Sequence, residues 1–213
     1  MSTPEHYFTA SPASPAELRP LEATLRGRRV RVLTAPGVFS GDRLDPGTRV
    51  LLETVADPPA TGHLADVGCG WGPVALAMAA ASPGATVWAA DVNERAVDLT
   101  ARNAAALGLT NVRALEAGEA LRRLRAEGVE LDEIWSNPPI RIGKAALHEL
   151  LRSWLGLLAP GGRAQLVVAK NLGADSLHRW LAEDVGADVT RAGTSGGFRV
   201  LTVTPQGPTR PTA

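Results

Sequence analysis

The chain has 213 residues and equal numbers of basic and acidic side chains, and its zero formal net charge excludes nucleic-acid binding driven by overall charge. Because 45% of the residues are hydrophobic and Cys69 is the only cysteine, we also exclude a largely disordered chain and an internal disulfide. The first fifteen residues lack a basic segment followed by an apolar one, and no apolar run is as long as a membrane span, so we expect a cytoplasmic protein.

The first 60 residues are expected to form an extension ahead of the main domain. Residues 1–20 are rich in Pro, Ser and Ala, which indicates an extended lead-in. Val30 and Val32 then alternate with arginines after Gly27, a pattern typical of a small β-hairpin. Gly, Asp and Pro indicate a loop, and a helix is expected over 48–56.

From residue 61 onward, short apolar runs alternate with segments of helical periodicity, and turn residues separate them. The pattern predicts strands at 63–68, 85–91, 111–115, 131–137, 163–170, 187–193 and 196–205, and helices at 72–81, 93–108, 118–128, 144–162 and 174–186.

Strands that alternate with helices indicate crossover connections and a mainly parallel sheet with helices on both faces. The last two strands leave no room for a helix between them, so the last strand is expected to be antiparallel. We therefore predict an α/β, doubly wound domain with a seven-stranded sheet over 61–205, followed by a flexible tail at 206–213. No feature of the sequence indicates an oligomeric state.

A glycine-rich loop follows the first strand of this domain. In the segment ADVGCGWG, residues 65–72, Gly68, Gly70 and Gly72 allow the backbone to approach a ligand closely. The following helix offers free N–H groups at its N-terminus. A dinucleotide fingerprint would have the spacing G-x-G-x-x-G, but Pro73 occupies the third glycine position, which weakens the case for NAD. Asp66, just before the loop, is a candidate acceptor for an ammonium group.

Two acidic residues follow the next two strands. Asp91 ends the second strand, about twenty residues after the glycines, where a carboxylate can bind the hydroxyls of a ribose. The alternative is that Asp91 only caps the helix that follows. Glu119 comes after the third strand and is a candidate acceptor for an adenine amino group, or else a solvated acid in the first turn of a helix.

The fourth strand ends in the segment SNPPI, residues 136–140. Asn137 and the carbonyl of Pro138 are acceptors that can hold the two hydrogens of an amino group, and Pro138 and Pro139 make the loop rigid. An amide or base nitrogen is a poor nucleophile, because its lone pair is delocalised. Fixed acceptors favour the pyramidal nitrogen, whose lone pair can attack an electrophile.

The glycine loop, Asp91 and SNPPI together resemble the class I S-adenosylmethionine-dependent methyltransferases. Residues 5–204 are similar to the methyltransferase small domain group, which includes small-subunit ribosomal RNA guanine-N2 methyltransferases. Further segments that carry this resemblance are HYF, GVFSGDRLDPGTRVLL, RIGK, KNLGADSLHRWL and GGFRVL.

The resemblance implies a Rossmann-like methyltransferase fold, S-adenosylmethionine as cofactor, and RNA as substrate. It implies cofactor binding by Asp66, Gly68, Cys69, Gly70, Gly72, Asp91, Val92, Glu119 and Asn137. Asn137, Pro138 and Pro139 would be catalytic, and Phe39, Ile140, Arg141 and Lys144 would contact the substrate.

The chain departs from this family at three points. Relatives often carry Asp where Glu119 stands, and the residue after Pro-Pro is commonly aromatic, whereas here it is Ile140. The larger ribosomal RNA enzymes also carry a second, degenerate copy of the domain, which this chain lacks.

Three other functions stay open from the sequence: methylation of a protein glutamine amide or a small-molecule amine, an NAD-linked reductase, and a non-catalytic cofactor-binding protein. The four histidines show no metal-ligand spacing with one another or with Cys69, so no metal is expected.

Overall fold

A computed structural model describes residues 17–206 of the chain. Most of the expected lead-in and nearly all of the expected C-terminal tail lie outside these residues. The strands are β1 (Arg19–Leu25), β2 (Arg28–Thr34), β3 (Thr61–Val67), β4 (Gly84–Asp91), β5 (Val112–Glu116), β6 (Leu131–Ser136), β7 (Leu158–Ala169), β8 (Ala187–Ser195) and β9 (Phe198–Pro205). The helices are α1 (Pro46–Thr54), α2 (Pro73–Ala81), α3 (Glu94–Ala106), α4 (Ala117–Ala126), α5 (Lys144–Leu155) and α6 (Ala174–Glu183), with short 3-10 helices η1 (Ile140–Ile142) and η2 (Lys170–Leu172).

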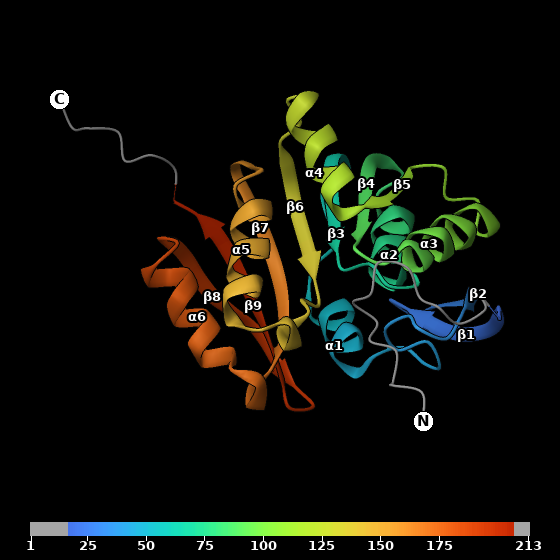
Figure 1. The fold of residues 1–213 in the computed structure, drawn as a ribbon, viewed down its shortest axis with the longest axis horizontal. Coiled ribbons are helices and arrows are strands. Elements are labelled where there is room, and N and C mark those ends of the chain that lie inside the picture. Colours follow the sequence, from blue (N-terminus) through green and yellow to red (C-terminus); the bar gives the residue numbers. More distant parts are fainter. Residues whose placement is uncertain (1–16, 207–213) are drawn as a thin grey trace.

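The main sheet has seven strands in the order β5-β4-β3-β6-β7-β9-β8 (Figure 1). Strands β3 to β7 pair in parallel, and β9 is antiparallel to both of its neighbours. The predicted seven-stranded, doubly wound sheet with an antiparallel last strand is therefore confirmed. The expected N-terminal hairpin is also present, as the separate two-stranded sheet of β1 and β2.

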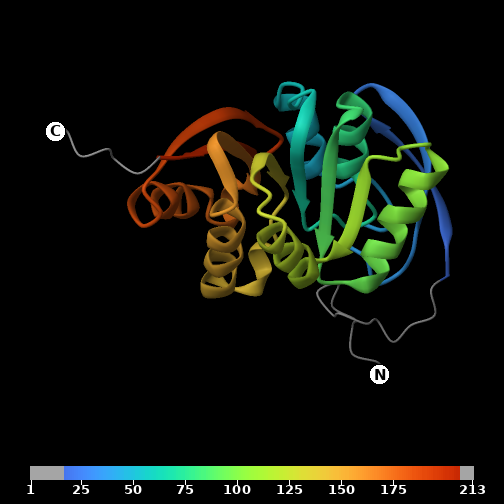
Figure 2. The same ribbon diagram turned by 90° about the horizontal axis from the view of Figure 1, so that it is seen from above.

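Each face of the sheet has its own apolar core. One core joins the sheet to α1, α2, α3 and the hairpin, and the other joins it to α4, α5 and α6. Figure 2 shows α5 and α6 on one side of the sheet and the blue hairpin on the other. All five tryptophans are buried, so they belong to these cores.

Capping residues define where two of the helices begin. Asn93 accepts a hydrogen bond from the N–H of Arg95 and caps α3, which ends just before Gly108, as expected. Asp45 accepts from the N–H of Thr48 at 2.9 Å and caps α1. Because Pro46 occupies the first position of the helix, where a missing N–H is tolerated, α1 begins two residues earlier than predicted.

One predicted helix was too long. The apolar pattern favours a helix over 144–162, but α5 ends at Leu155 and β7 begins at Leu158. Leu158 pairs with Leu131 of β6, and a register shift follows before the regular ladder resumes at Glu133. The segment at Leu158 is apolar enough for a helix or a strand, and its pairing with β6 makes it a strand.

The strand order reverses between β3 and β6. From β3 the chain moves to one edge through β4 and β5, and it then returns to β6 on the other side of β3. In open α/β sheets a ligand binds at such a point, beyond the carboxyl ends of the strands. Within residues 17–206, no helix is long and apolar enough to cross a membrane.

Candidate active site

A cavity of about 500 Å³ opens at the carboxyl ends of β3, β4 and β6. This volume is within the range of small-molecule and cofactor sites. Both the segment before α1 and the loop after β6 contribute to its walls. The residues that line it include Phe39, Arg43, Asp45, Gly68, Asp91, Val92, Asn93, Ala117, Asn137, Pro138, Pro139, Ile140, Arg141 and Leu172.

The glycine loop forms a tight cradle between β3 and α2. Gly68, Gly70 and Gly72 have φ angles of 83°, 56° and 98°, a region that other residues rarely adopt. A side chain at Gly72 would also lie 3.0 Å from Thr100, whose hydroxyl donates to the carbonyl of Gly70 at 3.0 Å. The loop conformation therefore depends on glycine and is fixed by contact with α3.

Cys69 contributes to this loop through its backbone. Its N–H and that of Gly68 donate to the carbonyl of Ala90, at 3.0 and 2.8 Å, which ties the loop to β4. The thiol is buried, and burial raises its pKa well above the ordinary value of 9.0. It is therefore a protonated packing group and not a nucleophile.

Asp91 lines the cavity at the end of β4, and Val92 beside it is 40% exposed. One carboxylate oxygen of Asp91 accepts from the N–H of Gly70 and the other from the N–H of Asn93, both at 2.9 Å. These bonds hold both oxygens in fixed positions. Burial raises the pKa of Asp91, and the backbone N–H donors oppose this effect.

Asp66 lies deeper, at the base of the loop, and is 1% exposed. Its Oδ2 accepts from the N–H of Ala75 at 2.9 Å, in the first turn of α2. Burial raises its pKa to about 8, and the nearby charge of Asp91 adds to the increase. Asp66, Gly70 and Asn137 line a second cavity of about 20 Å³, large enough for a single water molecule.

Asn137 follows β6 and lines both cavities. Its amide nitrogen donates to Oδ2 of Asp45 at 2.8 Å and to the hydroxyl of Thr48 at 3.1 Å. An amide group has two N–H donors and one oxygen, so these bonds use both donors. The amide oxygen is therefore the group that Asn137 can offer to a ligand.

The two prolines after Asn137 shape the wall of the cavity. The carbonyl of Pro138 accepts the N–H of Ile140 at 2.8 Å, and Pro139 accepts that of Ile142 at 3.1 Å, which begins η1. One lone pair of the Pro138 carbonyl is thus used within the loop, and one is left. Ile140 lines the cavity directly after the prolines.

Glu119 and Lys144 do not line either cavity. Bonds from Arg123 and Arg122, both 2.6 Å long, hold the Glu119 carboxylate on α4 and lower its pKa. Ala117, at the start of α4, is the residue of this helix that reaches the cavity. Lys144 is exposed at the start of α5, whereas Arg141 lines the cavity mouth.

Exposed apolar side chains gather at this mouth. Phe39 is 37% exposed and Leu172 is 42% exposed, and with Val92 they are three of the four large exposed hydrophobic residues between 17 and 206. All three line the cavity. Phe39 was a predicted substrate residue, but Leu172 was not, although it lies in the segment KNLGADSLHRWL, which was noted only for its resemblance to the family.

The segment that carries Phe39, residues 36–45, is attached to the loops that follow β3 and β4. The side chains of Asn93 and Arg95 donate to the carbonyls of Gly37 and Pro36, at 2.7 and 2.6 Å. The Trp71 ring N–H donates to the carbonyl of Ser40 at 3.3 Å. This segment is therefore bonded to the loops after β3 and β4 and, through Asp45, to Asn137.

Between residues 17 and 206, no group of three or more His, Cys, Asp or Glu side chains is arranged to bind a metal ion. The site offers fixed acceptors, apolar walls and a glycine cradle. These features suit a cofactor with hydroxyl groups and a substrate that donates N–H groups.

Solved structures share this fold. A T. thermophilus "16S rRNA N2 G1207 methyltransferase (RsmC) in complex with AdoMet and Guanosine" matches with a TM-score of 0.75 and 26% identity, over 90% of this chain and 52% of that one. TrmN from Thermus thermophilus matches with a TM-score of 0.58 and 28% identity, over 74% of this chain and 48% of that one.

Sequence relatives extend the likeness. YbxB of Bacillus subtilis (strain 168) is 33% identical over 179 residues, 84% of this chain and 88% of its own length. Ribosomal RNA small subunit methyltransferase C of Salmonella choleraesuis (strain SC-B67) is 35% identical over 140 residues, 64% of this chain. The match spans only 39% of that relative. A model of the family "Methyltransferase small domain" matches residues 29–202, and the chain therefore belongs to this methyltransferase family.

Proposed function

We propose that this protein transfers a methyl group from S-adenosylmethionine to an exocyclic amino group, most specifically N2 of a guanine in ribosomal RNA, in the cytoplasm. The observation that carries the proposal is Asn137, whose amide oxygen is left for a ligand at a cavity that also contains Asp91. Membership of a methyltransferase family removes the NAD-linked reductase as a candidate.

The residues present fit S-adenosylmethionine. Gly68 and Gly70 carry no side chains, and a Cβ at either would meet other backbone atoms only at 3.9 and 3.8 Å, ordinary van der Waals distances, so the space beside these glycines is open to a ligand. Asp91 would hold the ribose, and Val92 and Ala117 would line the adenine side. Asp66 would face the ammonium end through the smaller cavity. Contact between Glu119 and adenine stays a prediction, because its carboxylate would first have to leave two arginines.

When bound, this cofactor supplies an electrophilic methyl group on a sulfonium. The task of the protein is then to present the acceptor nitrogen. The Asn137 oxygen and the remaining lone pair of the Pro138 carbonyl accept its two hydrogens, and the rigid loop keeps these acceptors in place. After transfer the nitrogen is cationic and releases a proton to water without a dedicated base.

Three observations support a base as the acceptor. Phe39, Ile140 and Leu172 provide apolar surface for a flat ring at the mouth, and Arg141 is placed for a phosphate. A solved relative is named as a complex with guanosine, and several curated relatives are named as ribosomal RNA methyltransferases. A base paired in RNA would have to leave its stack, at a cost of a few kcal/mol.

The test is methyl transfer from labelled S-adenosylmethionine to ribosomal RNA, ribosomal subunits, cell protein and small amines in parallel. We expect label in RNA, as N2-methylguanine after nucleoside digestion. Label in protein glutamine would instead support the amide-methyltransferase alternative, and cofactor binding without transfer to any acceptor would support a non-catalytic role.

Replacing Asn137 by Ala tests whether this residue holds the target nitrogen. Turnover should fall by roughly 100-fold, as it does when one fixed polar contact of a transition state is removed. Cofactor affinity, measured by calorimetry, should change little. Equal losses in turnover and affinity would contradict the role of Asn137 as an acceptor for the target nitrogen.

A further inference from the structure

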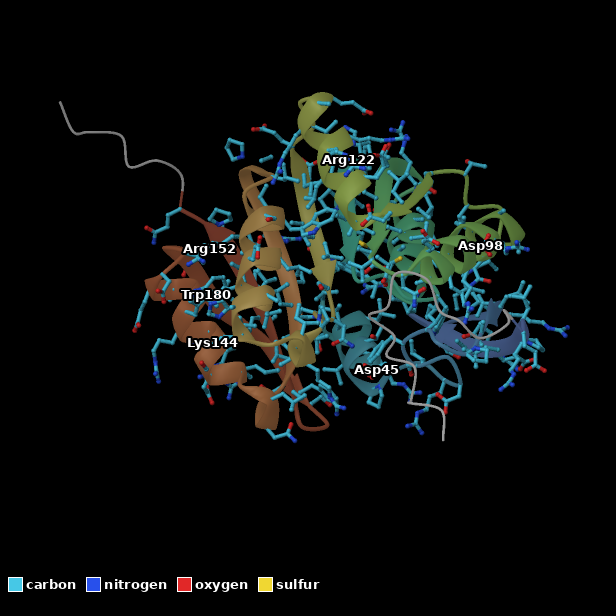
Figure 3. The ribbon with its side chains drawn as sticks, in the orientation of Figure 1. Asp45, Asp98, Arg122, Lys144, Arg152 and Trp180 are labelled. Carbon is cyan, nitrogen blue, oxygen red and sulfur yellow. The ribbon has the colours of Figure 1, made fainter. Side chains whose placement is uncertain are left out.

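We infer that Asp45 is a positioning residue for methyl transfer: it sets the orientation of the Asn137 amide, so that the oxygen faces the target nitrogen. This inference rests on the proposed function for its catalytic consequence. The bond between Asp45 and Asn137 joins residues 92 positions apart, from the segment before α1 and the loop after β6. In the view of Figure 3, Asp45 and Lys144 lie on opposite sides of the lower end of β6.

The orientation of an Asn side chain is ambiguous until its partners are identified, because the amide nitrogen and oxygen have nearly the same shape. A carboxylate offers only acceptors, so Asp45 can bind the NH2 group and repels the oxygen. The Oδ2 atom of Asp45 is 2.8 Å from the Asn137 nitrogen. Rotation of the amide by 180° would place the Asn137 oxygen against the Asp45 carboxylate. It would also leave the two N–H donors of Asn137 without these acceptors.

Thr48 completes this arrangement. Its hydroxyl accepts the second N–H of Asn137 at 3.1 Å, and Thr48 is only 4% exposed, so water does not compete freely. The backbone N–H of Thr48 also donates to Oδ2 of Asp45 at 2.9 Å. The first turn of α1 thus holds the carboxylate, and the carboxylate holds the amide.

Helix capping alone would not require this contact. Ser caps a helix as well as Asp does, but its side chain is shorter and does not reach Asn137. A Ser at position 45 would therefore keep α1 intact and release the amide. This difference separates a positioning role from a purely structural one.

Three variants test the inference. Asp45→Ser should keep the melting temperature and cofactor affinity close to wild type and reduce turnover by about 10- to 100-fold. Asp45→Ala, which also loses the cap, should melt at a lower temperature and lose turnover to the same degree. Recovery of wild-type turnover by Asp45→Ser would overturn the inference, because capping would then be the whole role of Asp45.

A double-mutant cycle adds a second criterion. If Asp45 acts through Asn137, Asp45→Ser should cost no further turnover in an Asn137→Ala background, in single-turnover assays with labelled methyl groups. Equal losses in both backgrounds would show that Asp45 acts independently of Asn137, and would overturn the inference.

The orientation itself can be measured without any substrate. In ¹⁵N–¹H spectra of the full chain, the side-chain NH2 signals of Asn137, assigned with Asn137→Ala, should be protected from exchange in wild type and lose that protection in Asp45→Ser. Identical signals in both proteins would overturn the inference even if RNA is methylated. If wild type methylates no RNA, the proposed substrate is wrong, and this measurement still decides the role of Asp45.

Discussion

At the scale of single residues, burial gives two aspartates of the site different electrostatic settings. Asp91 reaches the cavity and is held by two backbone N–H groups, whereas Asp66 is almost wholly buried and has one such bond. The pKa of Asp66 is raised to about 8 from an ordinary 3.8, with burial as the main cause. The folded protein therefore keeps a proton on Asp66 under conditions in which the unfolded chain has lost it.

This linkage predicts a pH dependence of stability. Between about pH 4 and pH 8 the unfolded chain binds fewer protons at Asp66, so the free energy of unfolding should fall as pH rises, by at most about 1.4 kcal/mol per pH unit. Asp66→Asn should remove this contribution. The free energy of unfolding of the variant should therefore rise relative to that of wild type as the pH approaches 8. Urea unfolding across the range measures it, with the exposed Asp98→Asn as control. A difference between variant and wild type that does not change with pH would contradict the assignment.

At the scale of elements, a buried side chain of α3 helps to join the hairpin of β1 and β2 to the main domain. Asn103 is 1% exposed, and its amide accepts from the N–H of Leu33 at 2.7 Å and donates to the carbonyl of Leu33 at 2.8 Å. It also donates to the carbonyl of Trp71 at 2.9 Å, next to the glycine loop. Asn103 thereby extends the edge of β2 as another strand would.

We expect Asn103→Ala to destabilise the protein by about 2–4 kcal/mol, because several buried backbone groups would lose their partner. Thermal or urea unfolding measures the loss. Hydrogen exchange should show faster opening of the hairpin than of β3 or β6. Asn171→Ala, on an exposed residue of η2, is the matched control. Uniform exchange across all strands would argue against a specific role in attaching the hairpin.

Some contacts between elements could be predicted from the sequence, and others could not. The glycine loop, Asp91 and Asn137 were predicted to meet because parallel strands bring their carboxyl ends to one edge. The contact of Asp45 with Asn137 could not be predicted, since Asp45 before Pro-Gly has every property of a simple helix cap. The boundary between α5 and β7 was missed for a different reason: Leu157 and Leu158 fit a helix or a strand, and pairing with β6 decides.

At the scale of the whole molecule, a neutral chain must bind RNA through a local surface. Arg43 and Arg141 line the cavity, and Lys144 and Lys170 are exposed at the starts of α5 and η2. The cations that line the cavity lie among apolar residues and do not form a uniform basic face. The match to the curated ribosomal RNA methyltransferase of Salmonella choleraesuis spans only about two fifths of that relative.

Salt dependence measures this surface. If Arg141 and Lys144 bind phosphates, replacing each by Ala should weaken RNA binding and reduce the slope of log affinity against log salt by about one per contact. Arg125→Ala, on the exposed face of α4, should leave the slope unchanged. Equal effects of all three replacements would indicate that binding depends on general charge and not on the mouth.

The segment of residues 36–45 belongs at once to both halves of the site. It is bonded to the loops that follow β3 and β4, and through Asp45 it contacts Asn137. Under the proposed function, replacing this whole segment should therefore affect both the methyl acceptor and the methyl donor, whereas single changes at Asp45 or Asn137 should spare the donor. If the protein methylates a guanine as proposed, rewriting this stretch to accept another nucleobase would also change the residence time of the spent cofactor.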